Sequence, residues 1–253
     1  MINYQTFAHV YDQVMDQEVY QSWIDFTRTS IEQYAKRPVE NIMELACGSG
    51  KVAIDLSEQG FTLVGVDLSE NMLAIAQEKA NRHGQEIAWV QADMRDLRDF
   101  DPVDLVTLYS DSLCYLTDFQ DVKSVFASVV SILEEGGLFL FDVHSIYQMT
   151  QVFPGYQYSY TDEDLAFIWQ SYEYDYPNSV EHVITMFLAD QEDESESPLY
   201  ERFEEVHVER SFTIEEYKSA LLEAGFTAVK VMADFGKSQL DDHTTRWFFI
   251  CQK

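Results

Sequence analysis

The sequence predicts an α/β fold: a doubly wound, mostly parallel seven-stranded sheet with an antiparallel C-terminal edge strand, plus a small inserted antiparallel sheet. Up to His144, short apolar runs alternate with segments of helical periodicity, which is typical of a parallel sheet covered by helices. From Tyr156 to Arg210, aromatic residues recur with a period of two, which favours antiparallel strands. A glycine turn after the first strand indicates where a ligand binds.

This change of pattern divides the chain into three parts. Residues 1–38 are expected to form a helical segment that caps the site, because apolar residues recur at helical spacing and Pro38 stops the helix. Residues 39–148 and 211–253 are expected to form the main, cofactor-binding domain. Residues 149–210 are expected to form an inserted antiparallel β lid.

The first half of the chain should supply five strands and the helices between them. Ser69 is a predicted helix N-cap, and Gly60 and Gly136 follow predicted helix ends. The predicted strands are 39–46, 61–67, 86–91, 103–109 and 138–143, and predicted helices include 51–59 and 119–133.

The second half should supply the insertion and the closing strands. Antiparallel strands are predicted at 167–174, 180–188 and 199–211, joined by a turn at Pro177 and by the acidic run 190–197. Thr213 and Glu216 form a predicted capping box for the next helix. Two final strands, 226–232 and 245–251, suit a hairpin at one sheet edge.

Charge and cysteine content limit the functional classes. The 253 residues include 45 Asp and Glu but only 16 Lys and Arg, for a formal charge of −29. Such a field repels nucleic acid and anionic membranes, so neither is expected as a partner. Three scattered cysteines favour free thiols in a reducing compartment, and neither a signal peptide nor a long apolar run is visible. We therefore expect a cytoplasmic protein; the sequence predicts no oligomeric state.

Each of the first three predicted strands ends in an acidic residue. Glu44 precedes the glycine turn of Gly48 and Gly50, Asp67 ends the second strand, and Asp93 follows the third. An acceptor-only carboxylate after the second strand suits the two hydroxyls of a ribose. A carboxylate after the third suits an exocyclic amino group, and Glu44 favours a cationic group over a phosphate. Together these features predict an adenosine-containing ligand with a positive charge.

Four segments in order resemble the motifs of class I S-adenosylmethionine-dependent methyltransferases, whose fold is Rossmann-like. They are Glu44-Leu45-Ala46-Cys47-Gly48-Ser49-Gly50, Gly65-Val66-Asp67-Leu68-Ser69, Ala92-Asp93-Met94 and Leu133-Glu134-Glu135-Gly136-Gly137. The insertion resembles that of small-molecule members related to glycine N-methyltransferases. The resemblance implies that S-adenosyl-L-methionine is the cofactor and S-adenosyl-L-homocysteine the product. The cofactor-binding residues that it implies are Glu44, Ala46, Cys47, Gly48, Gly50, Asp67, Leu68, Asp93, Met94 and Tyr109.

One position departs from the family, which usually has glycine where this chain has Ala46. Gly48, Gly50 and Ala53 also satisfy the dinucleotide fingerprint G-x-G-x-x-G/A, with Asp67 further on. An NAD(P)-dependent oxidoreductase is therefore an alternative, and a non-catalytic, cofactor-binding regulatory protein is another. Aminopropyl transfer is a further option on the same fold.

Methyl transfer from a sulfonium is an in-line displacement that needs an aligned small-molecule acceptor. A nitrogen acceptor needs only to be neutral, whereas an oxygen acceptor needs a base, and the sequence leaves the two open. The candidate catalytic residues are Asp111 and His144, after the fourth and fifth strands. No metal ligands are predicted. The candidate substrate residues are Tyr4, Tyr11, Trp169 and Arg246.

Overall fold

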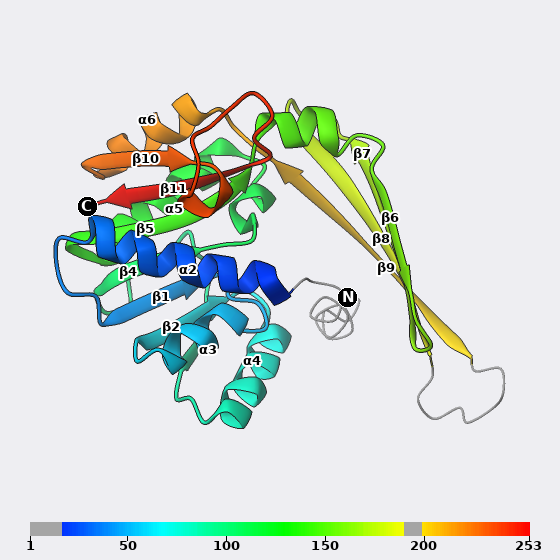
Figure 1. Cartoon of the computed structure of the whole chain (residues 1–253), viewed down its shortest axis with the longest axis horizontal. Helices are drawn as coiled ribbons and strands as arrows, with labels where there is room; N and C mark the ends of the chain where they lie inside the picture. Colours follow the sequence, from blue (N-terminus) through cyan, green and yellow to red (C-terminus); the bar gives the residue numbers. More distant parts are fainter. Residues whose placement is uncertain (1–16, 190–198) are drawn as a thin grey trace.

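A computed structural model describes residues 17–189 and 199–253, and this part of the chain forms two sheets (Figure 1). The main sheet has seven strands, in the order β10 (Ala228–Met232), β11 (Arg246–Gln252), β5 (Leu133–His144), β4 (Val103–Leu108), β1 (Asn41–Leu45), β2 (Thr62–Asp67) and β3 (Ala88–Gln91). The predicted α/β architecture is confirmed.

The strand order reverses at β1, which pairs in parallel with β2 on one side and with β4 on the other. In such sheets the crevice for a ligand lies beyond the carboxyl ends of the strands at this switch point. The C-terminal pair differs in detail from the prediction. The strand β11 is antiparallel to both of its neighbours and lies between β5 and β10, so β10 is the edge strand.

Successive residues of a strand point to opposite faces of the sheet, and here both sets are apolar. Helices therefore cover both faces of the main sheet. Ile42 packs in one apolar cluster with α2 (Gln17–Tyr34) and α3 (Lys51–Glu58). Met43 packs in the other cluster with α5 (Phe119–Ile132) and α6 (Ile214–Ala224). The helix α4 (Glu70–His83) follows β2, and its predicted cap is confirmed, since the Ser69 hydroxyl accepts from the backbone N–H of Met72.

The inserted sheet is antiparallel throughout and extends away from the main sheet (Figure 1). Its strands are β6 (Gln157–Thr161), β7 (Leu165–Glu173), β8 (Ser179–Ala189) and β9 (Tyr200–Arg210). A small apolar cluster on this sheet includes Phe167 and Met186, with Met72 of α4 packed against it. The start and end of the insertion are joined, because the Ser211 hydroxyl donates to the carbonyl of His144 at 2.6 Å.

The capping box before α6 is confirmed: the Thr213 hydroxyl accepts from the backbone N–H of Glu216, and the Glu216 carboxylate accepts from the N–H of Thr213. The remaining short elements are η1 (Ser112–Tyr115), η2 (Gln148–Val152) and η3 (Asp234–Gly236). Tyr4, Tyr11 and the acidic run 190–197 lie outside the described residues. No helix within residues 17–189 and 199–253 has the length and apolar character needed to cross a membrane.

Candidate active site

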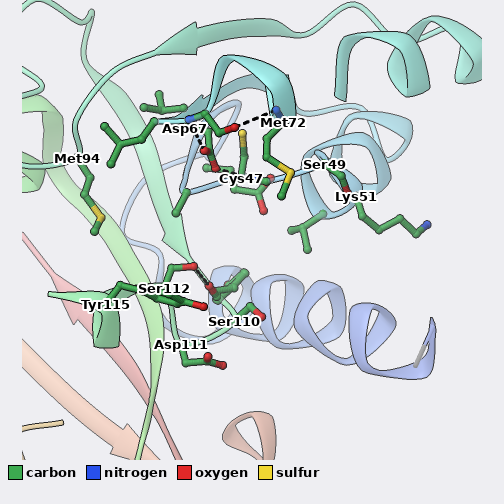
Figure 2. Close-up of a pocket in the computed structure, with 18 of the residues that line it drawn as sticks. Cys47, Ser49, Lys51, Asp67, Met72, Met94, Ser110, Asp111, Ser112 and Tyr115 are labelled. Atoms are coloured by element: carbon green, nitrogen blue, oxygen red, sulfur yellow. Dashed lines mark hydrogen bonds between the residues drawn. The ribbon is translucent and has the colours of Figure 1, made fainter. Parts of the chain in front are cut away.

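A cavity of about 540 Å³ lies at the carboxyl ends of β1, β2 and β4, at the switch point of the sheet (Figure 2). It collects most of the residues that the resemblance implies for the cofactor. Those on its wall are Glu44, Ala46, Cys47, Gly48, Asp67, Leu68, Met94 and Tyr109. The strand-end carboxylates Glu44 and Asp67 therefore face one space, as predicted from the sequence.

The glycine corner turns the chain from β1 into α3. Gly50 is the N-cap of α3 with φ +79°, and its N–H donates to the carbonyl of Cys47 at 2.9 Å. A Cβ at Gly50 would lie 2.5 Å from the ring of Trp89, so the corner closes only around glycine. Gly50 offers no side chain to cap this helix, and in its first turn the backbone N–H of Ala53 donates to the Glu44 side chain.

Ala46 has the left-handed backbone conformation, with φ +49°, that glycine adopts readily. For an L-amino acid this conformation costs about 1–2 kcal/mol. The structure thus gives a physical reason for glycine at this position in related sequences. Here the Ala46 methyl group adds to the cavity wall instead.

Asp67 is held by two backbone groups on the cavity wall. Its Oδ2 accepts from the N–H of Gly48 and its Oδ1 from the N–H of Ser69, both at 2.8 Å. Burial raises the pKa of Asp67, and these two hydrogen bonds oppose the shift. Each oxygen keeps a second lone pair, so the carboxylate fits the two ribose hydroxyls predicted for it.

Glu44 is a buried acid beside the same cavity. It is 5% exposed, and its Oε2 has no hydrogen-bond partner among residues 17–189 and 199–253. Burial raises the pKa of Glu44 to about 8, and repulsion by Asp67 and Asp55 adds to the shift. A hydrogen bond from the backbone N–H of Ala53 opposes the shift, but the unpaired Oε2 is still stabilised only by a proton or by a cation. The site therefore fits the positively charged end of S-adenosylmethionine.

Asp93 does not join this group. Its carboxylate pairs with Arg95, with Oδ2 at 2.6 Å from Nη2, and the hydrogen bonds from Arg95 lower the pKa of Asp93. Its neighbours Ala92 and Met94 line the cavity instead. The adenine contact predicted for the Asp93 side chain has no support in this geometry and stays a prediction.

The candidate catalytic residues lie together at the ends of β4 and β5. Asp111 lies on the cavity wall, and its two oxygens face Arg246 Nη2 at 2.7 Å and His144 Nε2 at 3.3 Å. Burial acts to raise the pKa of Asp111, but the charges of His144 and Arg246 hold it well below its usual range. The His144 side chain is buried behind Asp111 and is not among the residues that line the cavity.

Asp142 holds the corner that carries Asp111. Ser110 and Asp111 both have positive φ, at 55° and 51°, and Asp142 accepts hydrogen bonds from both of their backbone N–H groups. Asp142 also pairs with Arg246 and accepts from the Trp23 indole N–H at 3.0 Å. This buried carboxylate was not among the candidate residues, since it lies within an apolar strand rather than in a motif.

Two predicted substrate residues are engaged elsewhere. Arg246 binds Asp111 and Asp142, and it does not line the cavity. Trp169 is also absent from the cavity wall, and its indole N–H donates to His182 Nδ1 at 3.1 Å. Neither side chain lines the cavity, and direct contact of either with the acceptor stays a prediction. Each side chain instead supports a buried polar group near the site.

Several cavity residues were not predicted. Tyr115 and His207 face each other with ring centroids 5.7 Å apart, and His207 comes from β9 of the inserted sheet. Neither residue belongs to a sequence motif, so only the fold brings them together. Lys51 also lines the cavity, and its place directly after Gly50 was a usable signal.

Comparisons with known proteins show which family this chain resembles. A family model described as "Methyltransferase domain" matches residues 42–137. A curated relative from Geobacillus sp. (strain WCH70), named as a "Putative methyltransferase", is 38% identical over 252 residues and covers 100% of both chains. A crystal structure of an S-adenosylmethionine-dependent methyltransferase from Clostridium acetobutylicum is similar with a TM-score of 0.85 and 28% identity, covering 98% of each chain.

Two more distant structures share the fold. One is CalS10 with S-adenosylmethionine bound, an amino pentose methyltransferase from Micromonospora echinaspora, at 17% identity and a TM-score of 0.74 over 100% of this chain and 98% of that one. The other is the sugar N-methyltransferase KedS8 from Streptoalloteichus, at 20% identity and a TM-score of 0.72 over 92% and 87%.

Proposed function

The chain belongs to the class I S-adenosylmethionine-dependent methyltransferase family, and on this premise we propose that it methylates a nitrogen or oxygen atom of a small molecule. The cofactor, S-adenosylmethionine, supplies an electrophilic methyl group on a positively charged sulfur. The family membership replaces the nicotinamide-dependent alternative. The observation that carries the proposal is the shared cavity of Glu44, Asp67 and the glycine corner.

The chain's own residues divide the work of binding the cofactor. Asp67 is proposed to accept hydrogen bonds from the ribose hydroxyls, with Gly48 and Ser69 fixing its orientation. Glu44 is proposed to favour the cationic end, because its Oε2 lacks another partner in the described chain. The wall from Leu68 to Met72 and the side chain of Met94 enclose the rest of the molecule.

The acceptor is proposed to lie at the Asp111 end of the cavity, near Tyr115 and His207. A neutral amine is the favoured acceptor, because His144 is not on the cavity wall and both Asp111 oxygens already face other groups. An amine needs alignment rather than a base. The name of the fold relative KedS8, a sugar N-methyltransferase, supports the same choice. For a hydroxyl acceptor, the base roles of His144 and Asp111 stay predictions.

Calorimetry tests the cofactor assignment. S-adenosylhomocysteine should bind one site per chain, and Asp67→Asn should weaken it about tenfold or more, since a charge-assisted pair of hydrogen bonds is lost (about 1.4 kcal/mol per tenfold). Asp96→Asn is the matched control and should bind as tightly as the parent chain, because the exposed Asp96 carboxylate pairs with Arg98 and does not line the cavity. Binding of NAD without S-adenosylhomocysteine would overturn the proposal.

The choice between a nitrogen and an oxygen acceptor is tested with a panel of small amines and their hydroxyl analogues. Each compound is assayed for formation of S-adenosylhomocysteine. Turnover of an amine, with the matched alcohol inert, is the expected result. Turnover of alcohols alone would reject the amine. Cofactor binding without turnover of any panel compound would favour the regulatory alternative over the enzyme.

A further inference from the structure

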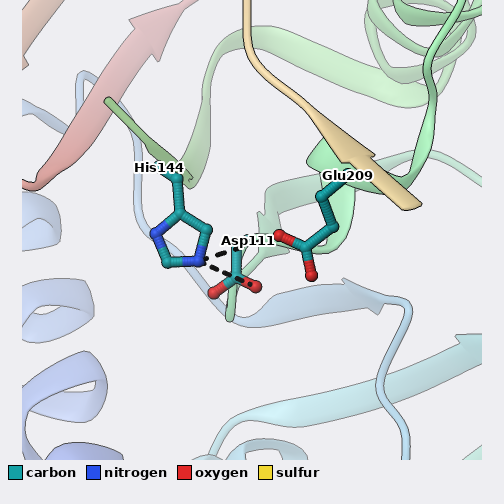
Figure 3. A group of neighbouring side chains, drawn as sticks. All are labelled: Asp111, His144 and Glu209. Atoms are coloured by element: carbon teal, nitrogen blue, oxygen red, sulfur yellow. Dashed lines mark ion pairs between the residues drawn. The ribbon is translucent and has the colours of Figure 1, made fainter. Parts of the chain in front are cut away.

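Three side chains from separate parts of the fold converge beside the acceptor end of the cavity (Figure 3). Asp111 follows β4, His144 ends β5 and Glu209 lies near the end of β9 in the inserted sheet. One donor atom of each lies within 4.8 Å of the others. His144 Nε2 is 3.3 Å from Asp111 Oδ2 and 3.8 Å from Glu209 Oε2. Glu209 and His144 are buried, and the Asp111 side chain is only 15% exposed.

Glu209 lacks a partner that would justify its burial. Its Oε2 has no hydrogen-bond partner among residues 17–189 and 199–253. The separation of 3.8 Å from His144 Nε2 is too long for a hydrogen bond. Asp111 and Asp142 share the guanidinium of Arg246, whereas Glu209 faces only the imidazole nitrogens of His144 and His182, each at 3.8 Å. Burying excess negative charge is costly unless a cation joins the group.

The spacing and the donor types match those around a metal ion. Ligand atoms that share an ion at bond lengths of about 2.0–2.2 Å lie about 3–3.5 Å from one another. The separation of 3.3 Å between His144 and Asp111 already meets this geometry, and that of 3.8 Å between His144 and Glu209 needs to shorten by a few tenths of an ångström. The Asp111 and Glu209 oxygens lie within 4.8 Å of each other, so Glu209 is the ligand that has to move in. One imidazole with two carboxylates suits Zn²⁺ and similar first-row divalent ions, whereas Mg²⁺ and Ca²⁺ prefer oxygen ligands alone.

One neighbouring group already orients a ligand as outer-shell partners do. Arg246 binds Asp111 Oδ1 at 2.7 Å and leaves Oδ2 toward His144. The Trp169 indole N–H donates to His182 Nδ1, so the proton of neutral His182 lies on Nε2, which faces Glu209 Oε2 at 3.8 Å. At this distance His182 does not hydrogen-bond Glu209, so Arg246 is the group that orients a ligand in this structure.

We propose that Asp111, His144 and Glu209 bind a first-row divalent transition-metal ion that joins the inserted sheet to the main sheet. This binding goes beyond the proposed function and does not depend on it. The sequence predicted no metal, because the three ligands come from β4, β5 and β9 and form no spaced motif. The ion would sit behind Asp111, so it holds the acceptor end of the cavity in shape.

Titration of the chelator-treated full chain with Co²⁺ tests the site. We expect one Co²⁺ per chain with visible absorption from nitrogen and oxygen ligands, displacement by Zn²⁺, and a thermal midpoint that rises with metal concentration. Glu209→Gln preserves shape and should weaken Co²⁺ about tenfold or more. The matched control is Glu204→Gln, on the same strand with its side chain 43% exposed, which should bind Co²⁺ unchanged.

Uptake of less than one Co²⁺ by the parent chain, with an unchanged thermal midpoint, would overturn the proposal. So would equal affinity in Glu209→Gln and Glu204→Gln. Binding of S-adenosylhomocysteine is measured on every variant as a test of folding, and His144→Gln replaces Glu209→Gln if the latter fails it. Failure of the parent chain to bind S-adenosylhomocysteine would reject the proposed function alone.

Discussion

Folding and cofactor binding favour different protonation states of Glu44. The folded chain buries this acid and raises its pKa from 4.5 to about 8, so the neutral form favours folding. A cationic cofactor favours the ionised form instead. The cavity is thus electrostatically unfavourable without ligand, as is common where binding energy is directed at one charge.

The pH dependence of stability follows from this shift. Because folding raises the pKa of Glu44, its stabilising contribution is complete below about pH 4.5 and is lost as the pH rises through about 8. Between these limits the cofactor-free chain should lose on the order of 4 kcal/mol relative to Glu44→Gln, which cannot ionise. Urea unfolding of both proteins at several pH values measures the difference. Parallel pH profiles would contradict the burial argument.

Ala46 gives a second prediction at this scale. Ala46→Gly removes the strain of about 1–2 kcal/mol that a left-handed conformation imposes on alanine. Glycine also raises the conformational entropy of the unfolded chain, which lowers the free energy of unfolding by about 0.5–1 kcal/mol. We expect stability to stay level or rise by about 1 kcal/mol in urea unfolding. The control is Ala74→Gly, at an exposed position within α4, where the same change should cost about 1 kcal/mol. Equal losses in the two variants would remove the strain argument.

Among single residues, the sequence predicted the position of those that a strand end or a backbone turn places. The glycine corner and Asp67 follow from strand ends, and both lie where predicted. Asp93 and Arg246 lie next to or within the expected strands, but each side chain forms an ion pair that a strand pattern does not reveal. Asp93 pairs with Arg95, and Arg246 pairs with the sequence-distant Asp142. Side-chain direction is decided by such pairing, which depends on contacts across the fold.

At the scale of elements, Arg246 couples the C-terminal strand to the rest of the molecule. It extends from β11 to Asp111 after β4 and to Asp142 on β5, which in turn accepts from Trp23 of α2. Four elements therefore meet at one buried ion-pair network. The sequence predicted these strands and the helix, but their polar connection required the sheet order.

Removing one partner of this network should be severe. Arg246→Met leaves Asp142 buried without its cation and should destabilise the chain by about 3–5 kcal/mol. Adding Asp142→Asn removes that charge and should recover part of the loss. Urea unfolding of the parent chain, both single variants and the double variant gives the coupling energy. Additive losses would show that the two residues do not interact.

Element boundaries show where patterns are informative. The helix from Phe119 was predicted to within one residue, and the caps at Ser69 and Thr213 were correct, because capping depends on local sequence. The strand β5 begins five residues earlier than predicted, at Leu133, since Gly136 was taken as a helix stop rather than as part of a strand. The strand β6 was not separately predicted, although Tyr158 and Tyr160 alternate with polar residues; all five of its residues are exposed in the fold.

At the scale of the whole molecule, the formal charge of −29 affects stability as well as partners. Like charges repel most in the compact state, and salt screens that repulsion. Raising NaCl from about 0.01 M to about 0.3 M should therefore increase the urea midpoint at neutral pH. The increase should disappear near the isoelectric point, about 4.2, where the net charge vanishes. A salt effect of equal size at both pH values would contradict this origin.

The hydrogen bond between Ser211 and the carbonyl of His144 has a consequence for the evolution of the family. The inserted sheet leaves the main sheet after His144 and returns at Ser211, so the two ends of the insertion lie side by side at one junction. Lineages can therefore lengthen, shorten or exchange that sheet without disturbing the register of the strands that hold the cofactor. Divergence in acceptor choice can proceed on one side of this junction while methyl donation is conserved on the other.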